Sequence, residues 1–448
     1  MLDDLSLFDI ILPPLYIFFA FLIANYIQVK NLFYRPEYEY FLLGLMAKVL
    51  GSICLGLIYY FYYTDGGDTT NYFESARAYV NLFSKNTADF FQGWLGDATI
   101  DEYYFFDSDT GYPVYHHRDK NSFFVVRLLI PIVALGFKSY FASAVLTACL
   151  TFTGIWKLYQ TFLCEYPNLR KQFAIAILFV PSCVFWGSGI MKDSFTLSAV
   201  GWFTYSFYFF FILRRRKLVY VIEMLLSAGL ILAIKPYIFF ALLPGTILWM
   251  SNQWVKEIDN STFKFLAGPF LISVGLGLGY LALNQMGDSL GVYKVDTVLD
   301  RAVTVQQDMK AEYYGGKSFD IGDFDASASG VISKAPIAIF SGIFRPAAWD
   351  VRNVVMLVSA MENTYLLILT VFLFMRLKFW GFFSLTRKNP IVLFSMLFSL
   401  FFAFSVGLTV ANFGSLVRLR IPELPFFVAG LFILRHLYEK QSGNRVRF

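Results

Sequence analysis

The first long apolar stretch of the chain is FDIILPPLYIFFAFLIANYIQ, residues 8–28. A helix that crosses the hydrocarbon core of a bilayer needs about 20 mainly apolar residues, and this stretch has that length. It lacks a basic leader and is longer than the apolar core of a cleavable signal peptide. We therefore expect residues 8–28 to form a permanent membrane-spanning helix.

Stretches of the same character recur along the whole chain. Apolar residues make up 57% of the sequence and charged residues 15%, whereas a soluble domain usually carries about 25% charged residues. The sequence predicts an all-α, polytopic membrane bundle with about 11 spans in a single integral membrane domain, 1–448. The expected spans after the first are 40–62, 140–163, 172–190, 195–213, 218–234, 237–252, 263–284, 353–376, 390–411 and 421–437.

Two long polar segments, 64–121 and 285–350, interrupt this series of spans. A further stretch, 122–138, is apolar but short, and it contains Arg127 and Pro131. We expect it to be a re-entrant or interfacial helix, because such elements are tolerated where protein or water surrounds them. The alternative is a twelfth crossing, which places 64–121 in the cytoplasm or breaks the charge pattern.

Basic residues in short connections predict the orientation of the spans. The strongest cluster, Arg214 to Lys217, is assigned to the cytoplasm, and alternation from it places 64–121 and 285–350 on the outer face. The chain is then a multi-pass protein of a bacterial inner membrane. Its net charge of +5 fits basic cytoplasmic loops and membrane lipids, so no nucleic-acid partner is expected.

Several cations in very short outer connections break this positive-inside bias. Charge near hydrocarbon is costly and usually marks function. Arginine binds phosphate with paired hydrogen bonds and lysine binds it as a point charge, so a phosphate or diphosphate head group is the expected ligand. The candidate phosphate-binding residues are Lys192, Lys235, Arg345, Arg418 and Arg420.

An acidic turn, Asp65-Gly66-Gly67-Asp68, directly follows the second span. Asp68 or Asp65 could accept a proton as a general base, and the two carboxylates could hold a divalent metal. The expected chemistry requires no cofactor, and three histidines in the chain make a histidine-rich zinc site improbable. The alternative is that this turn only caps the next helix.

Other polar residues are candidates for contacting the substrate. Histidines in polar loops are more often solvated, and the mid-span Glu362 could simply pair with an outer cation. The candidate residues are Tyr72, His116, His117, Arg118, Asp193 and Glu362.

Simple structural interpretations also exist for the basic residues. Asp193 could cap a helix and pair with its neighbour Lys192. Lys235 could extend to the interface along its own alkyl chain. Arg418 and Arg420 could do no more than anchor the last helix.

The heptapeptide Gly66-Gly67-Asp68-Thr69-Thr70-Asn71-Tyr72 is similar to the Gly-x-Asp-Thr-x-x-Tyr signature of EpsG/Wzy-type polysaccharide polymerases. The turns 186–193 and 418–422 are also similar to this group, and the layout resembles GT-C-type membrane glycosyltransferases. The resemblance implies a polyprenyl-(di)phosphate-linked sugar donor, a glycan acceptor and an acidic residue in an early outer loop.

Two other classes of function are compatible with the sequence. A transporter or flippase would use the outer cations and Glu362 to bind and move an anionic lipid-linked sugar. The third class is a scaffold without catalytic activity in envelope assembly. Transporters often contain inverted repeats and a site at the midplane. The chain has no detectable repeat, and its polar residues gather on one face, which favours the enzyme.

Overall fold

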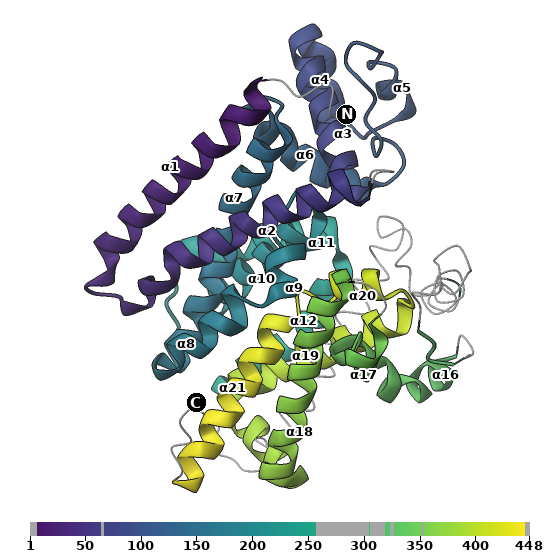
Figure 1. The fold of residues 1–448 in the computed structure, drawn as a ribbon. Helices are drawn as coiled ribbons and strands as arrows, with labels where there is room; N and C mark the ends of the chain where they lie inside the picture. The colour runs from purple at the N-terminus through teal and green to yellow at the C-terminus, as the bar shows by residue number, and fades with distance from the viewer. Residues whose placement is uncertain are drawn as a thin grey trace. The chain divides into compact units, whose positions relative to one another are not determined.

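The computed structural model describes residues 7–63, 67–256, 304, 319–322, 327–351 and 354–443. Every element assigned in these ranges is a helix, which confirms the all-α class for this part of the chain (Figure 1). Six helices there are long and apolar enough to cross a membrane: Asp9–Leu32, Pro36–Phe61, Tyr140–Glu165, Lys192–Ile212, Met356–Lys388 and Pro390–Thr409.

These helices support membrane association, while the total of about 11 crossings stays a prediction. The expected span 263–284 lies outside the described residues. Two other expected spans, 218–234 and 237–252, form shorter apolar helices. The choice of membrane and the face of each connection remain predictions as well.

The chain divides into two compact units. The first comprises Met1–Gln160, Cys183–Phe203 and Leu225–Lys235, and the second comprises Thr161–Ser182, Thr204–Met224 and Pro236–Phe448. The helices that lie wholly or mainly in the first unit are α1 (Leu7–Leu32), η1 (Pro36–Tyr40), α2 (Phe41–Phe61), α3 (Asp68–Lys85), α4 (Thr87–Leu95), α5 (Ile100–Tyr103), α6 (Lys120–Leu135), α7 (Tyr140–Glu165), α9 (Pro181–Trp186), α10 (Lys192–Phe207) and α11 (Leu218–Ile234).

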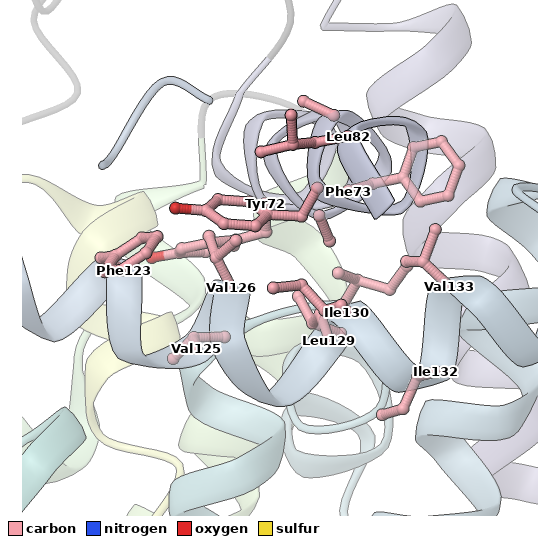
Figure 2. Packing of buried hydrophobic residues seen from close by; sticks show 14 of the residues in the cluster. Tyr72, Phe73, Leu82, Phe123, Val125, Val126, Leu129, Ile130, Ile132 and Val133 are labelled. Atoms are coloured by element: carbon pink, nitrogen blue, oxygen red, sulfur yellow. The ribbon is translucent and has the colours of Figure 1, made fainter. Parts of the chain in front are cut away.

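The polar segment 64–121 is largely helical in its described part. Its helix α3 packs along α6, and Figure 2 shows Tyr72 and Phe73 of α3 against Val126 and Leu129 of α6. Helix α6 has 16 residues, so it is about 24 Å long and shorter than the ~30 Å hydrocarbon core. This length fits the expected re-entrant or interfacial helix, which stays a prediction.

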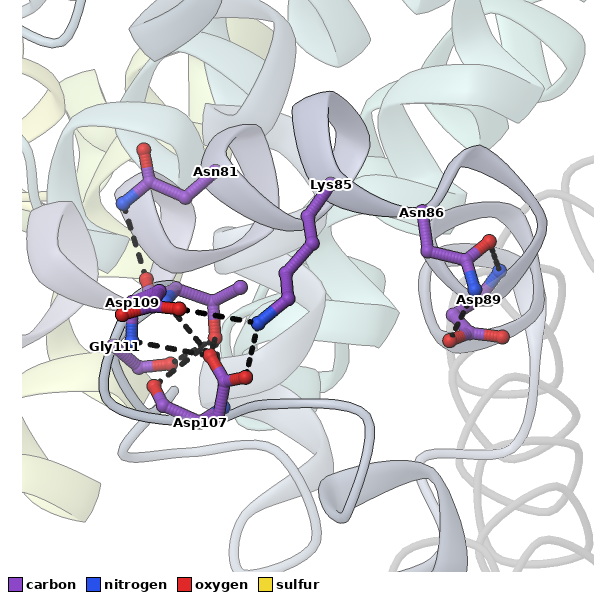
Figure 3. A network of polar contacts seen from close by, with 8 residues as sticks. Asn81, Lys85, Asn86, Asp89, Asp107, Asp109 and Gly111 are labelled. Carbon is purple, nitrogen blue, oxygen red and sulfur yellow. Dashed lines mark hydrogen bonds and ion pairs between the residues drawn. The ribbon is translucent and has the colours of Figure 1, made fainter.

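The connection after α5 is tied back onto the last turns of α3 (Figure 3). The Lys85 ammonium pairs with Asp107 and lies 3.4 Å from Asp109, and Asn81 donates to the carbonyl of Thr110 at 3.1 Å. The hydrogen bond from Lys85 is the main reason that the pKa of Asp107 falls to about 2. The clamp directs the following residues back along α3, so Tyr115 reaches the first turn of that helix.

Helices α7 and α10 approach each other closely through two glycines. A Cβ atom on Gly154 would lie 2.0 Å from the carbonyl oxygen of Ser198, and one on Gly201 would lie 2.1 Å from that of Gly154. Small residues allow this backbone contact in membrane helices. The crossing holds α10, whose first residues belong to the candidate site, close against α7.

The second unit is built mainly from the C-terminal half of the chain. Helix α17 is apolar and packs on α19, so part of the expected outer loop 285–350 is buried in this unit. Helix α18 is kinked at Lys378, where φ is 57°. Among the residues that the structure describes, the helices of this unit are η2 (Pro167–Leu169), α8 (Arg170–Phe173), η3 (Ala174–Leu178), η4 (Tyr208–Ile212), α12 (Pro236–Lys256), α16 (Ala328–Ser333), α17 (Ala335–Phe344), η7 (Ala348–Asp350), α18 (Val354–Lys388), α19 (Pro390–Thr409), α20 (Phe413–Leu419) and α21 (Leu424–Ser442).

The expected continuous span 172–190 is a series of short helices instead. Helical structure stops at Phe179 and Val180 and resumes with α9 at Pro181. Proline has no N–H to donate, and it disfavours helical geometry in the residue before it. The proline therefore explains the break.

Candidate functional site

Four helix ends meet in the first unit and bring charged side chains together. Helices α3, α6 and α10 contribute their N-terminal ends, and α11 contributes its C-terminal end. The charged residues at these ends, called here the helix-end cluster, are Asp68, Asp119, Lys192, Asp193 and Lys235. Helix N-termini carry a partial positive charge and favour anions.

Asp68 is the first residue of α3, and it is half-buried. Its carboxylate accepts a hydrogen bond from the Tyr115 hydroxyl at 3.1 Å. The helix is capped by Thr70, whose hydroxyl accepts from the N–H of Gly67 at 3.0 Å and donates to the Gly67 carbonyl at 2.8 Å. Thr70 thus provides the side-chain cap of this helix. Asp65 lies outside the described residues.

Asp119 links the start of α6 to the start of α10. It caps α6 by accepting from the N–H of Asn121 at 3.0 Å, and it also accepts from the Ser122 hydroxyl. Lys192 donates to the same carboxylate at 3.1 Å and lies within electrostatic range of Asp68. Burial raises the pKa of Asp119, but Ser122 and Lys192 more than offset this effect and hold the pKa below its usual value.

Asp193 and Lys235 form the second ion pair of the cluster. Asp193 is fully buried, and the Lys235 side chain, 6% exposed, pairs with it. The amide of Asn121 donates to the carbonyl of Ala233 at 2.7 Å and ties α6 to α11 next to this pair. Asp193 therefore pairs with a residue 42 positions away and not with its neighbour Lys192, and Lys235 does not extend to the surface.

Two of the expected substrate-contacting residues are buried beside the helix-end cluster and support it. The Tyr72 ring, 1% exposed, packs against Tyr115 with 4.9 Å between centroids, and its hydroxyl lies 3.3 Å from that of Ser122. The His116 ring is 1% exposed. Both side chains are thus enclosed by protein contacts in this structure, and their role in contacting a substrate stays a prediction.

His116 holds the polar segment of the first unit together. Its Nδ1 lies 2.7 Å from the Tyr79 hydroxyl and its Nε2 lies 3.0 Å from the carbonyl of Thr99. Burial lowers the pKa of His116 to about 4, and the hydrogen bond to Thr99 only partly opposes this effect. The imidazole is neutral at pH 7, which corrects the expectation of a solvated histidine. His117 and Arg118, in contrast, are exposed.

We expect the stability of the folded chain to fall as the pH drops from about 6.5 toward 4. An unfolded histidine titrates near pH 6.5, so the unfolded state binds a proton there that folded His116 refuses. The full effect is on the order of 3 kcal/mol. Thermal unfolding in detergent between pH 7.5 and 4.5 measures it. His116→Gln should flatten the pH dependence, and an unchanged slope in that variant would contradict the assignment.

Lys48 is a buried cation in the middle of α2 that sequence inspection passed over. Its side chain is 6% exposed and donates to the carbonyl of Gly187. Gly187 begins the turn that leads into Lys192, so this contact holds the start of α10. An ionisable residue inside an apolar run is the signal that could have identified it.

Arg420 is the centre of a separate polar cluster in the second unit. Its guanidinium is fully buried and donates to the carbonyls of Ile343 at 2.8 Å and Arg345 at 3.1 Å, and to the Asn363 side chain. It lies 3.7 Å from Glu362, which accepts from the N–H of Ser182 at 2.8 Å. Glu362 thus pairs with an arginine, in line with the alternative that this mid-span acid serves only as the partner of a cation. These contacts give Arg420 a structural role, while its expected phosphate contact stays a prediction.

Arg345 is also engaged within the second unit. It donates two hydrogen bonds to Asp350, at 3.0 and 2.6 Å, and lies over the rings of Phe319 and Phe413 at 5.0 and 5.1 Å. Protein partners thus hold Arg345 in place, and its expected phosphate contact stays a prediction. Arg418 is half-buried, and its phosphate contact stays a prediction.

The helix-end cluster therefore contains Asp68, Lys192, Asp193 and Lys235 of the predicted site, and it adds Asp119, while Tyr115 supports it through Asp68. Among the described residues, no group of three or more His, Cys, Asp or Glu side chains is arranged to hold a metal ion. Since Asp65 is not among them, a metal shared by Asp65 and Asp68 is untested. A comparison of the chain with protein-family models, curated proteins and solved structures finds no significant match.

Proposed function

We propose that this chain is a membrane glycosyltransferase or polysaccharide polymerase. It takes a sugar from a polyprenyl-(di)phosphate carrier at the outer face of the inner membrane and transfers it to a glycan acceptor. The observation that carries the proposal is the proximity of a carboxylate, Asp68, and an ammonium, Lys192, at the meeting point of three helix N-termini. Sugar transfer from a phosphate carrier requires a proton acceptor and a site for negative charge.

Lys192 stabilises the negative charge of the leaving phosphate, and Asp68 accepts the proton of the acceptor hydroxyl. The bond between the anomeric carbon and the phosphate oxygen breaks, and the electron pair leaves with the phosphate. Lys192 and the three helix N-termini stabilise this developing negative charge. The acceptor hydroxyl forms the new bond to the anomeric carbon, and its proton passes to Asp68. The exposed Arg118, next to Asp119, adds positive charge for the diphosphate.

Asp119 is poorly suited to accept the proton. Its carboxylate already accepts hydrogen bonds from the backbone of Asn121 and from the side chains of Ser122 and Lys192. These donors hold the pKa of Asp119 below its usual value, which makes it a weaker base. We therefore assign Asp119 the role of positioning Lys192.

A flippase for an anionic lipid-linked sugar is the second candidate. It is favoured by the helix break before Pro181, since discontinuous helices are common in transporters. Buried charges such as the pair of Glu362 and Arg420 are a further feature of such proteins.

An in vitro assay separates the two candidates. The purified full chain is reconstituted in liposomes with radiolabelled lipid-linked oligosaccharide extracted from the producing cells. The proposal predicts longer glycan together with free polyprenyl diphosphate, and neither product with heat-denatured protein. Movement of intact lipid-linked sugar across the bilayer, without any transfer, would favour the flippase. A full-length chain that does neither would leave only the scaffold.

A further inference from the structure

An open cavity of about 430 Å³ lies between α18 and α21 in the second unit. It is separate from the helix-end cluster, which belongs entirely to the first unit. Its polar lining comes from the last turns of both helices and consists of Arg376, Ser384, Lys388, Tyr438, Gln441 and Ser442.

The cavity has an excess of positive charge. Within the described parts of the chain, neither Arg376 nor Lys388 has an acidic partner, and the Arg376 guanidinium lies over the Phe372 ring at 5.4 Å. Glu439 follows the lining residue Tyr438 in the sequence, but it is already paired with Arg435 at 2.9 Å. Two cations with hydroxyl and amide donors around one hollow suit a phosphate group.

Exposed aromatic residues neighbour the cavity-lining residues of α18 along the chain. The kink at Lys378 separates the final turns of α18 from its long apolar part. Phe379, Trp380 and Phe383 on these turns are 59%, 81% and 47% exposed. Exposed aromatic rings next to cations are typical of segments that lie at the level of lipid head groups.

We propose that this cavity binds the phosphodiester head group of an anionic phospholipid. Arg376 and Lys388 neutralise the phosphate, while Ser384 and Tyr438 donate hydrogen bonds to its oxygens or to the head-group alcohol. The aromatic residues after the kink pack against the upper part of the acyl chains. This site does not depend on sugar transfer, so it stands or falls separately from the proposed function.

The test uses the full chain in nanodiscs of phosphatidylcholine and phosphatidylglycerol at a ratio of four to one. Native mass spectrometry counts the lipids of each class that remain bound after release. We expect Arg376→Ala and Lys388→Ala each to lower the preference for phosphatidylglycerol about fivefold, the effect of one cation near an anionic surface. Arg387→Ala is the matched control, because Arg387 is exposed beside Lys388 but does not line the cavity.

Three results would overturn the proposal. One is retention of the two lipids by the wild-type chain in the same four-to-one ratio as in the nanodisc. Another is the same loss in Arg387→Ala as in Lys388→Ala, which would indicate general surface charge. The third is complete displacement of phosphatidylglycerol by millimolar inorganic phosphate, which would identify a soluble anion as the ligand. Lys388→Arg should retain the preference for phosphatidylglycerol.

Discussion

Asp68→Asn lowers the rate of sugar transfer by about 10²–10⁴-fold, the usual contribution of a positioned general base. Asparagine has nearly the shape of aspartate, and its side-chain oxygen can still accept the hydrogen bond that Tyr115 donates at 3.1 Å. The substitution removes the negative charge of the side chain and, with it, the ability to take a proton. The initial rate of glycan lengthening by the purified full chain in liposomes measures the effect.

Asp101→Asn is the matched control for this substitution. Asp101 is an exposed carboxylate in the same polar segment, in the first turn of α5. It should keep the wild-type rate. A rate above one tenth of wild type in Asp68→Asn, with normal folding, would show that Asp68 is not the base. The transfer reaction itself could still exist, with another proton acceptor.

Lys192→Met separates the two roles within the helix-end cluster. It keeps the length of the side chain but removes the charge that faces Asp68 and Asp119. If Lys192 stabilises the leaving group, Lys192→Met should lower the transfer rate most for donors that have a poorer leaving group. Asp68→Asn should instead slow all donors by a similar factor, because the base acts on the acceptor.

The class of the fold could be predicted from the sequence because membrane helices are recognised one at a time. Each expected span rests only on its own length and polarity, so 8–28 and 40–62 agree with α1 and α2 to within a few residues. The same local logic failed at 172–190. That stretch is apolar enough to span, and only Pro181 indicates that the helix is interrupted.

Much of the candidate site could not be predicted, because its pairs join distant parts of the chain. Lys192 contacts Asp119 across 73 positions, and Lys235 contacts Asp193 across 42. Sequence alone favours local partners, as it did for Lys192 and Asp193. Asp119 carried a usable signal, since an Asp directly before an apolar helix is a typical N-cap.

Burial is the other property that the sequence did not reveal. Arg420 follows Arg418 by two positions in a short connection. Both are arginines, the residue type expected at a phosphate-binding site. The structure buries Arg420 completely and leaves Arg418 half-buried. The difference depends on the packing of α17, α18 and α20, which residue types do not encode locally.

Arg420→Ala is expected to destabilise the folded chain by about 3–5 kcal/mol, the cost of removing one partner from a buried charge network. The substitution leaves the carbonyl oxygens of Ile343 and Arg345 without this donor. It also removes the positive charge between Glu362 and Glu423. Both carboxyl oxygens of Glu423 already lack a hydrogen-bond partner in the described part of the chain. Reversible denaturation by sodium dodecyl sulfate measures the free energy of unfolding.

Arg435→Ala is the control for the loss of an arginine. Its pair with Glu439 is partly exposed, with side-chain exposures of 20% and 26%, so it should cost less than about 1 kcal/mol. Where Arg420→Ala does not fold, Arg420→Lys gives the measurement, because lysine keeps the charge but cannot reach three acceptors at once.

We attribute the loss of stability in Arg420→Ala to the carboxylates of Glu362 and Glu423, which lose their counter-ion. Compensating substitutions test this. Adding Glu362→Gln and Glu423→Gln to Arg420→Ala removes both buried carboxylates, and the triple variant should recover at least 2 kcal/mol of the roughly 3–5 kcal/mol lost. Neutral amides need no counter-charge, although they still need hydrogen bonds. If the triple variant is as unstable as Arg420→Ala alone, the arginine acts through its carbonyl contacts and not as a counter-ion. A phosphate-binding arginine would behave differently from either case, since its loss would weaken donor binding and leave the free energy of unfolding unchanged.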